Sequence, residues 1–300
     1  MAQVTRSGFI ALAGRPNVGK STLVNAMVGH KVAIVSDKPQ TTRRAIRGVL
    51  TVPEQYQLVL TDLPGVQRPR DALTSRMQKR VESELAEADA ALFVVNGDQG
   101  VGGPGDRFIA EALGSARIPI VIAVNKVDRL NHARTVESLQ IASELGLPEA
   151  EVFPISARTG KGVPPLLDYL AQLLPEGPFY FPPEDFSDQP EDVMLAELVR
   201  EQVLLRTREE VPHAVEVEID EIEERESDGL LIVRARVWAE TESQKGILVG
   251  AGGKMVRAVG TAARKEIEDL LDRRVHLDLN VRVRKGWRRD EGLLDRLGIE

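Results

Sequence analysis

The chain has 300 residues, 42% of them hydrophobic and 28% charged, and it contains no cysteine. This length is more than one core needs, so two domains are expected. Without cysteine the protein has no disulfide, no thiolate nucleophile and no zinc–thiolate site. Its apolar runs are too short to cross a bilayer, and its N-terminus, where glycine and polar residues interrupt the apolar run, is a poor secretory signal. These features predict a cytoplasmic protein.

The net charge of −7 looks unfavourable for a nucleic-acid-binding protein, but it is unevenly distributed. Residues 184–242 carry 6 basic and 19 acidic groups, whereas residues 243–290 carry 12 basic and 6 acidic groups. Salt screens exposed charges beyond about 10 Å, so a polyanion responds to the local patch more than to the total charge. The basic segment 243–290 therefore keeps nucleic-acid binding open.

The first 176 residues alternate strand-like apolar runs with amphipathic helical stretches, which predicts βαβ units around a mostly parallel sheet. The expected strands are residues 8–14, 45–52, 56–62, 91–98, 118–125 and 151–157, and the expected helices are residues 20–28, 74–88, 107–113, 135–145 and 163–174. Residues 1–176 are thus expected to form an α/β domain.

Residues 177–190 interrupt this alternation, and their prolines and aromatic side chains predict a semi-extended linker that packs locally. The order α-β-β-α-α-β then predicts a smaller α+β domain over residues 191–300. Its expected elements are a helix at 191–206, strands at 213–224 and 229–240, a glycine loop at 250–253 between the second and third helices, a helix at 254–271 and a strand at 275–287. The basic segment 281–289 has two interpretations, a strand end and tail near a nucleic acid or a charged, solvated edge.

A phosphate-binding loop follows the first expected strand. The sequence GRPNVGKS, Gly14 to Ser21, has the P-loop spacing and opens a helix, as the motif requires. Backbone N–H groups at Gly14 and Gly19 favour phosphate oxygens, Lys20 is expected to reach the β- and γ-phosphates, and the Ser21 hydroxyl is expected to bind Mg²⁺. The expected phosphate-site residues are Gly14, Asn17, Val18, Gly19, Lys20, Ser21, Thr22 and, further along the chain, Gly65.

Two further motifs complete a nucleotide site. Asp62 ends an expected strand in LTDLPG and is placed to hold Mg²⁺, although a strand-end aspartate before Pro-Gly is on its own as often a turn former. In NKVD, the Asp128 carboxylate can accept two hydrogen bonds from guanine that adenine does not offer, which favours GTP over ATP. The expected guanine-site residues are Asn125, Lys126, Asp128, Ser156 and Ala157, the last donating its N–H to guanine O6.

Together, GRPNVGKST, DLPG, NKVD and SA make the chain resemble the TrmE-Era group of translation-linked GTPases. The resemblance implies Thr42 of TTRR as a further Mg²⁺ ligand, with Thr41 as the alternative. Val66 stands where Ras-like enzymes carry a water-positioning glutamine, which implies slow intrinsic hydrolysis. Some relatives hold a potassium ion with an asparagine that matches Asn17, which implies K⁺-stimulated hydrolysis.

The second glycine loop, GAGG at Gly250–Gly253, lies in the basic segment. Alone, a G-x-x-G loop is more often a turn between packed helices. Its surroundings resemble a type II KH domain, a fold that clamps about four nucleotides of single-stranded RNA. The expected RNA-binding residues are Lys245, Ile247, Gly250, Ala251, Gly252, Gly253, Lys254 and Arg257. Arg264 is expected to add charge, and Ile247, Val256 and the facing strand are expected to form the apolar floor of the groove. Because Era loops typically carry lysine where Ala251 stands, one phosphate contact is expected to be missing.

The resemblance covers nearly the whole chain and implies an Era-like GTPase with a G domain, a linker and a KH domain. It implies binding of the 3′ end of small-subunit (16S) ribosomal RNA, a role in small ribosomal subunit assembly, a monomeric state and peripheral membrane association. GTP is expected to order the regions of Thr42 and Gly65, and hydrolysis to relax them. One alternative is a GTPase whose KH-like domain docks protein or membrane instead of RNA; another, an ATP-using enzyme, disagrees with NKVD.

Overall fold

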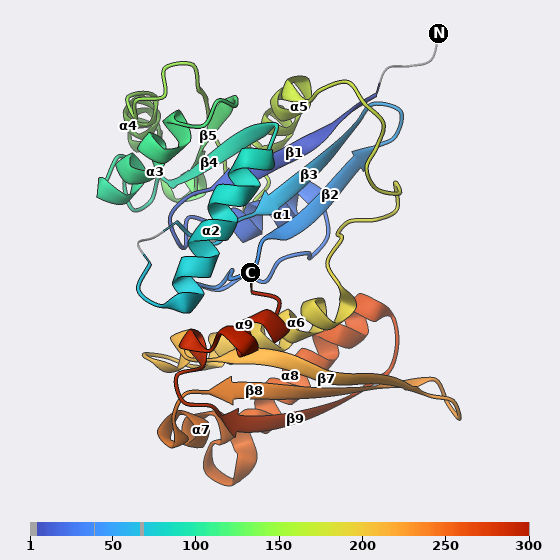
Figure 1. Ribbon diagram of the computed structural model, residues 1–300. Helices are drawn as coiled ribbons and strands as arrows, with labels where there is room; N and C mark the ends of the chain where they lie inside the picture. The colour runs from blue at the N-terminus through green and yellow to red at the C-terminus, as the bar shows by residue number, and fades with distance from the viewer. Residues whose placement is uncertain (1–4, 39, 67–68, 300) are drawn as a thin grey trace.

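The computed structural model describes residues 5–38, 40–66 and 69–299. It contains two sheets, each covered by its own helices, and the two halves of the chain lie one above the other with the C-terminus between them (Figure 1). Within the described residues no helix combines the length and the apolar character that crossing a bilayer would require.

The N-terminal half is built on a six-stranded sheet in the order β2-β3-β1-β4-β5-β6. Only β2 runs antiparallel to its neighbour, because a short turn joins it directly to β3. The strands are β1 (Arg6–Ala13), β2 (Ile46–Val52), β3 (Tyr56–Asp62), β4 (Ala90–Asn96), β5 (Ile120–Asn125) and β6 (Glu151–Pro154). All six expected strands are thus confirmed, with boundaries shifted by a few residues.

Helices cover both faces of this sheet, which makes its central strands almost wholly buried. One face packs against α1 (Lys20–Val28) and α5 (Val163–Leu173). The other face packs against α2 (Ala72–Glu87), α3 (Pro104–Gly114) and α4 (His132–Ser143). Because β1, β3, β4 and β5 run parallel, their carboxyl ends meet at one edge, and the candidate nucleotide residues follow these ends.

The expected linker is an ordered strap along the edge of the sheet. The Gln57 side chain on β3 donates to the carbonyl of Phe181 and accepts from the N–H groups of Tyr180 and Phe181. Farther along, the Phe186 ring stacks on His30 with ring centroids 4.0 Å apart. These contacts confirm that the proline-rich segment packs locally.

The C-terminal half has the expected order of elements. A three-stranded sheet, β7-β8-β9, pairs β7 and β8 antiparallel and β8 and β9 parallel. Its elements are α6 (Glu191–Arg206), β7 (Glu216–Arg225), β8 (Leu230–Ala239), α7 (Glu242–Val249), α8 (Lys254–Leu271) and β9 (Val275–Val283). Side chains of α6, α7 and α8 form one apolar core with the sheet.

Segment 281–289 begins at the end of an edge strand, where Arg282 is exposed, and then leaves the sheet. β9 stops at Val283, and the chain turns through a 3-10 helix (Trp287–Arg289) into α9 (Glu291–Arg296). Trp287 is fully buried in a cluster that contains Leu73 and Met77 of α2. The expected strand 275–287 was therefore too long at its end, because this apolar cluster draws Trp287 onto the first domain.

Candidate nucleotide site and nucleic-acid interface

The P-loop joins β1 to α1 and leaves no room for a side chain at Gly19. Its φ is +100°, and a Cβ there would lie 2.5 Å from Asn125 Nδ2, so glycine is required on both conformational and steric grounds. Beside it, Lys20 is 6% exposed, and its Nζ donates to the carbonyls of Gly14 at 3.2 Å and Arg15 at 3.3 Å. Burial lowers the pKa of Lys20, an effect that the charge of Asp62 partly opposes.

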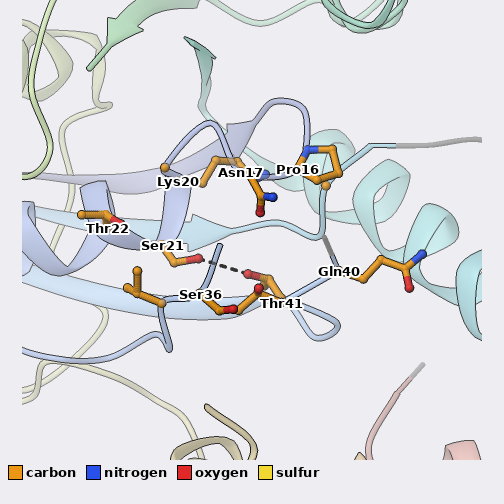
Figure 2. Close-up of a pocket in the computed structure, with 12 residues that line it drawn as sticks. Pro16, Asn17, Lys20, Ser21, Thr22, Ser36, Gln40 and Thr41 are labelled. Atoms are coloured by element: carbon orange, nitrogen blue, oxygen red, sulfur yellow. Dashed lines mark hydrogen bonds between the residues drawn. The ribbon is translucent and has the colours of Figure 1, made fainter. Parts of the chain in front are cut away.

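Three side-chain oxygens meet at the position expected for Mg²⁺. The Ser21 and Thr42 hydroxyls donate to Asp62 Oδ2 at 2.6 and 3.1 Å, and the two hydroxyl oxygens lie 3.1 Å from each other. The dashed line that starts at Ser21 in Figure 2 is this hydroxyl–hydroxyl contact. The Thr41 hydroxyl instead donates to the Lys38 carbonyl at 2.6 Å. The geometry thus brings Thr42, rather than Thr41, to Ser21 and Asp62.

Asp62 has the environment of a cation ligand. It is fully buried, and burial raises the pKa of its carboxyl, whereas Lys20 and the Ser21 and Thr42 hydroxyls lower it. Among the described residues its Oδ1 has no hydrogen-bond partner. An unpartnered buried carboxylate oxygen beside two hydroxyls fits a hard divalent cation such as Mg²⁺.

The segment before β2 closes over the P-loop and forms the other wall of the pocket (Figure 2). Asn17, at φ +63°, donates from its amide to the Asp37 carbonyl at 2.7 Å. Gly65 approaches so closely that a Cβ there would lie 2.7 Å from the Pro16 ring. The residues that line this pocket are Pro16, Asn17, Gly19, Lys20, Ser21, Thr22, Val35, Ser36, Gln40, Thr41, Thr42 and Gly65.

Asn125 ties the P-loop to the loop after β6. Its Nδ2 donates to the Val18 carbonyl at 2.8 Å, and its Oδ1 accepts from the Ala157 N–H at 2.9 Å. The Ala157 N–H, expected to meet guanine, is thus already engaged within the protein. Lys126 reaches the Asn17 carbonyl with its Nζ at 2.7 Å, which places its stem across the end of the P-loop.

The Asp128 carboxylate is held ionised between two donors. Ser156 Oγ donates to Oδ1 at 2.7 Å, and Arg158 Nη2 donates to Oδ2 at 2.8 Å. The Ser156 hydroxyl and the Arg158 charge lower the pKa of Asp128. The sequence motifs assigned no role to Arg158, although its guanidinium forms a hydrogen bond with the Asp128 carboxylate, the group expected to bind guanine.

The second glycine loop has the backbone that its sequence requires. Gly250, Gly252 and Gly253 all have positive φ, between 59° and 77°. A Cβ at Gly250 would lie 2.8 Å from the Met255 Cβ, whereas Gly252 and Gly253 face open space. Positive φ favours glycine, and the open side leaves the backbone of the loop accessible to a ligand.

A groove of about 350 Å³ runs from this loop between α8 and β9. Val256, Arg257 and Arg264 line it, as expected, but Lys245 and Ile247 do not, because they lie on α7; Ile247 is 49% exposed. The facing strand, expected to supply part of the groove floor, does so through residues of β9. The lining residues are Gly253, Val256, Arg257, Gly260, Thr261, Arg264, His276, Leu277 and Leu279.

Within residues 5–38, 40–66 and 69–299, no three His, Asp or Glu side chains are grouped so that they could hold a metal ion. The magnesium position described above depends on hydroxyl oxygens and a single carboxylate, so it is a different kind of site.

Family models match both halves of the chain. Residues 9–126 match the model described as 50S ribosome-binding GTPase, and residues 210–288 match the KH domain. Over 297 residues the chain is 47% identical to GTPase Era of Mycobacterium tuberculosis (strain ATCC 25618 / H37Rv), with 98% of each chain covered. It is 45% identical over 297 residues to GTPase Era of Mycobacterium sp. (strain KMS), covering 98% of this chain and 99% of that protein.

Two solved structures share the whole architecture. The crystal structure of Era in complex with MgGDPNP and nucleotides 1506–1542 of 16S ribosomal RNA matches with a TM-score of 0.95 at 33% identity, covering 98% of this chain and 99% of that chain. A tyrosine-to-alanine variant of Aquifex aeolicus Era bound to GDP·AlF4⁻ matches with the same score, identity and coverage. The chain belongs to the GTPase Era family, with a P-loop G domain followed by a KH domain.

Proposed function

We propose that the protein is a GTP-hydrolysing switch that binds the 3′ end of 16S ribosomal RNA through its KH domain and acts in small ribosomal subunit assembly. The observation that carries this proposal is the likeness, over 98% of the chain, to Era solved with MgGDPNP and nucleotides 1506–1542 of that RNA. The P-loop pocket and the groove beside the second glycine loop supply the two sites that such a switch needs.

The nucleotide site acts mainly by positioning and charge. Bound Mg²⁺ would neutralise charge on the β- and γ-phosphates; Ser21, Thr42 and Asp62 are the residues to hold it. Lys20 adds a buried positive charge at the phosphates. The Asp128 carboxylate selects guanine by accepting hydrogen bonds from the N1–H and the 2-amino group of the base. This requires Arg158 to give up its hydrogen bond to the Asp128 carboxylate.

Hydrolysis is expected to be slow without assistance. Val66 is 9% exposed and packs in the apolar cluster on the α2–α3 side of the sheet. Its side chain has no group to orient water, so backbone or another residue must place the nucleophile. We also propose that a K⁺ ion beside the P-loop assists hydrolysis and that Asn17 of this loop is its protein ligand, since the Asn17 amide already bridges the P-loop and Asp37.

RNA binding is proposed to combine the glycine backbone with the groove. Gly252 and Gly253 let phosphates approach, bases lie on Val256 and the β9 leucines, and Arg257 adds charge. Lys254 at the start of α8 is exposed and is proposed to compensate for Ala251. Lys245 and Ile247 are retained as contacts at the α7 edge.

The test is equilibrium binding of a short single-stranded RNA matching the 3′ end of 16S ribosomal RNA, with GDP or GDPNP. Wild type should bind more tightly with GDPNP, and Gly253→Asp should lose binding. Gly146→Asp is the matched control, because Gly146 also has positive φ and open space but lies in the G domain. Absence of RNA binding by wild type in both nucleotide states would favour a KH domain that docks protein or membrane.

We further propose a monomeric state and peripheral membrane association, both taken from the family resemblance. Analytical ultracentrifugation tests the first, and co-sedimentation with anionic vesicles tests the second.

A further inference from the structure

Helix α6 of the KH domain is buried on two opposite sides. Residues 195–204 are all shielded from solvent. Leu195, Leu198 and Val199 pack in the KH core, whereas Glu197 and Arg200 bind the stretch between α1 and β2. We call this stretch, residues 31–38 and 40–44, the switch segment. Charged residues at i and i+3 on one helical face therefore meet the segment that carries Thr42.

Arg200 connects the two domains next to Thr42. Its side chain is completely buried, and its Nη2 donates both to the Thr41 carbonyl and to Glu197 Oε2, the latter at 2.7 Å. Its Nε donates to Glu197 Oε1 at 3.1 Å and lies 3.6 Å from Glu216 Oε1. One guanidinium thus holds the peptide unit immediately before Thr42, and two KH-domain carboxylates hold that guanidinium.

The residues after Thr42 are held by the same domain. Arg43 donates to the Val215 carbonyl at 2.6 Å and to Glu216 at 2.8 Å. Arg44 donates to Glu197 at 2.6 Å and, from Nε and Nη2, to the Leu297 carbonyl at 2.8 and 2.7 Å. Between these anchored neighbours, the Thr42 side chain points the other way, toward Ser21 and Asp62.

A second contact holds the start of the switch segment. Glu201, one residue after Arg200 on α6, accepts the Val35 N–H at 2.8 Å and also binds the Lys31 ammonium. Thus α6 holds the switch segment on both sides of its middle. Thr42 cannot move far from Ser21 without breaking buried charged contacts, which costs more than breaking exposed ones.

We propose that Arg200 is a positioning residue for the Mg²⁺–GTP site: by holding the Thr41 carbonyl, it keeps the Thr42 hydroxyl at the cation position. The inference rests on the proposed function, since it assigns Thr42 to Mg²⁺, and it adds that the KH domain completes the nucleotide site. By linkage, if the packing of α6 on the switch segment tightens the binding of Mg²⁺ and GTP by some factor, then bound Mg²⁺ and GTP favour that packing by the same factor.

The test compares the affinities for GDP and MgGDPNP of full-length wild type, Arg200→Lys and Arg200→Gln. A lysine keeps the charge but lacks the fork that spans Thr41 and Glu197. We expect roughly tenfold weaker MgGDPNP binding by Arg200→Lys, corresponding to one charged hydrogen bond, with GDP binding unchanged. Arg206→Gln is the control, because Arg206 lies on the same helix and bonds to Gln202 of that helix.

Two readouts separate positioning from a general structural role. With EDTA in place of Mg²⁺, wild type and Arg200→Lys should bind GDPNP equally, because Thr42 then has no cation to hold. In a Thr42→Ala background, Arg200→Lys should cause no further loss of MgGDPNP affinity, since the double-mutant cycle removes the shared contact.

Three results would overturn the proposal. Arg200→Lys could weaken the binding of GDP and of MgGDPNP equally, or it could weaken neither. It could also lower MgGDPNP affinity in the Thr42→Ala background by as much as it does in wild type. If Arg200→Gln does not fold, Arg200→Lys alone tests the proposal, because the lysine retains a buried positive charge beside Glu197 and Glu216. A wild-type protein that fails to hydrolyse GTP or to bind the RNA would contradict the proposed function instead, so the two failures are distinguishable.

Discussion

Arg43 of the switch segment donates to Glu216 of the KH domain at 2.8 Å, and both side chains are completely shielded from solvent. Burial alone would raise the pKa of Glu216, but the charges of Arg44, Arg200 and Arg43 outweigh it and lower this pKa from 4.5 to about 2. Glu216 therefore joins the two domains as an anion over the whole physiological range of pH.

The stability contributed by Glu216 should depend on pH. It is fully present above the unfolded pKa near 4.5 and is lost as the pH falls toward the folded value of about 2. Glu216→Gln removes the negative charge that balances the buried guanidinium groups of Arg43, Arg44 and Arg200. This change should lower the free energy of unfolding by about 3–5 kcal/mol at neutral pH. Urea unfolding should show this difference from wild type shrinking by about pH 3.

A matched control is Glu223→Gln on the same strand, whose partner Arg234 lies 4.0 Å away in a mostly exposed pair. This change should cost less than about 1 kcal/mol. A Glu216→Gln penalty that is the same at neutral and acid pH would contradict the assigned role of its charge.

Base selection should change when the Asp128 carboxylate becomes an amide. Asp128→Asn keeps one acceptor for N1–H but turns a donor toward the guanine amino group, so GDP affinity should fall about 100-fold, or roughly 2–3 kcal/mol. Xanthosine diphosphate carries an oxygen where guanine has that amino group, so its affinity should rise. Competition binding with GDP, XDP and ADP measures both effects, and a parallel loss of all three would argue against Asp128 as the base reader.

Arg257 should contribute one phosphate contact to RNA binding. It lines the groove between α8 and β9, so Arg257→Ala should reduce the slope of log affinity against log salt by about 0.7 for a single strand. Arg274→Ala is the control, because Arg274 is 71% exposed and pairs with Asp228. Titrations at several salt concentrations give the slopes. Identical slopes for wild type and Arg257→Ala would place the RNA elsewhere.

The C-terminal cluster should stabilise the contact between the domains. Trp287 is fully buried, donates its indole N–H to the Ala214 carbonyl at 2.9 Å and packs with Leu73 and Met77. Trp287→Ala should lower the unfolding free energy by about 3–5 kcal/mol and separate the unfolding of the two domains. Differential scanning calorimetry should then show two transitions; a single transition at the wild-type temperature would refute this role.

Hydrolysis should be faster in K⁺ than in Na⁺ if Asn17 holds a monovalent cation. Asn17→Asp, which replaces the amide that donates to the Asp37 carbonyl, should reduce that difference. Turnover is measured in matched KCl and NaCl at one ionic strength, with CsCl as a control for ion size. Equal rates in K⁺ and Na⁺ for wild type would rule out the potassium role.

Local pattern was sufficient for most elements of both domains. The predicted helices 191–206 and 254–271 coincide with α6 and α8, because their periodicity and their proline and glycine boundaries lie within the segments themselves. The G domain motifs were found for a similar reason: each phosphate, cation or base contact needs particular residue types within a few positions, and parallel strands bring their ends to one edge.

The family resemblance favoured Thr42 and left Thr41 as the alternative. The two hydroxyl residues are adjacent in the sequence, and the fold shows that Thr42 meets Asp62 whereas α6 holds the Thr41 carbonyl. The sequence by itself determined that a G domain and a KH domain follow each other, because their signals are local.

Only the tertiary structure decided how the two domains meet. Glu216 belongs to a strand in which apolar and acidic residues alternate, a pattern that predicts a solvated acidic face, yet Glu216 is completely buried. The alternation of apolar and acidic residues shows which side chains of the strand point away from the KH core, but it cannot show that another domain covers those side chains. Its partner Arg43 lies 173 residues away along the chain in the other domain, and no local period connects residues that meet only when separate cores pack together.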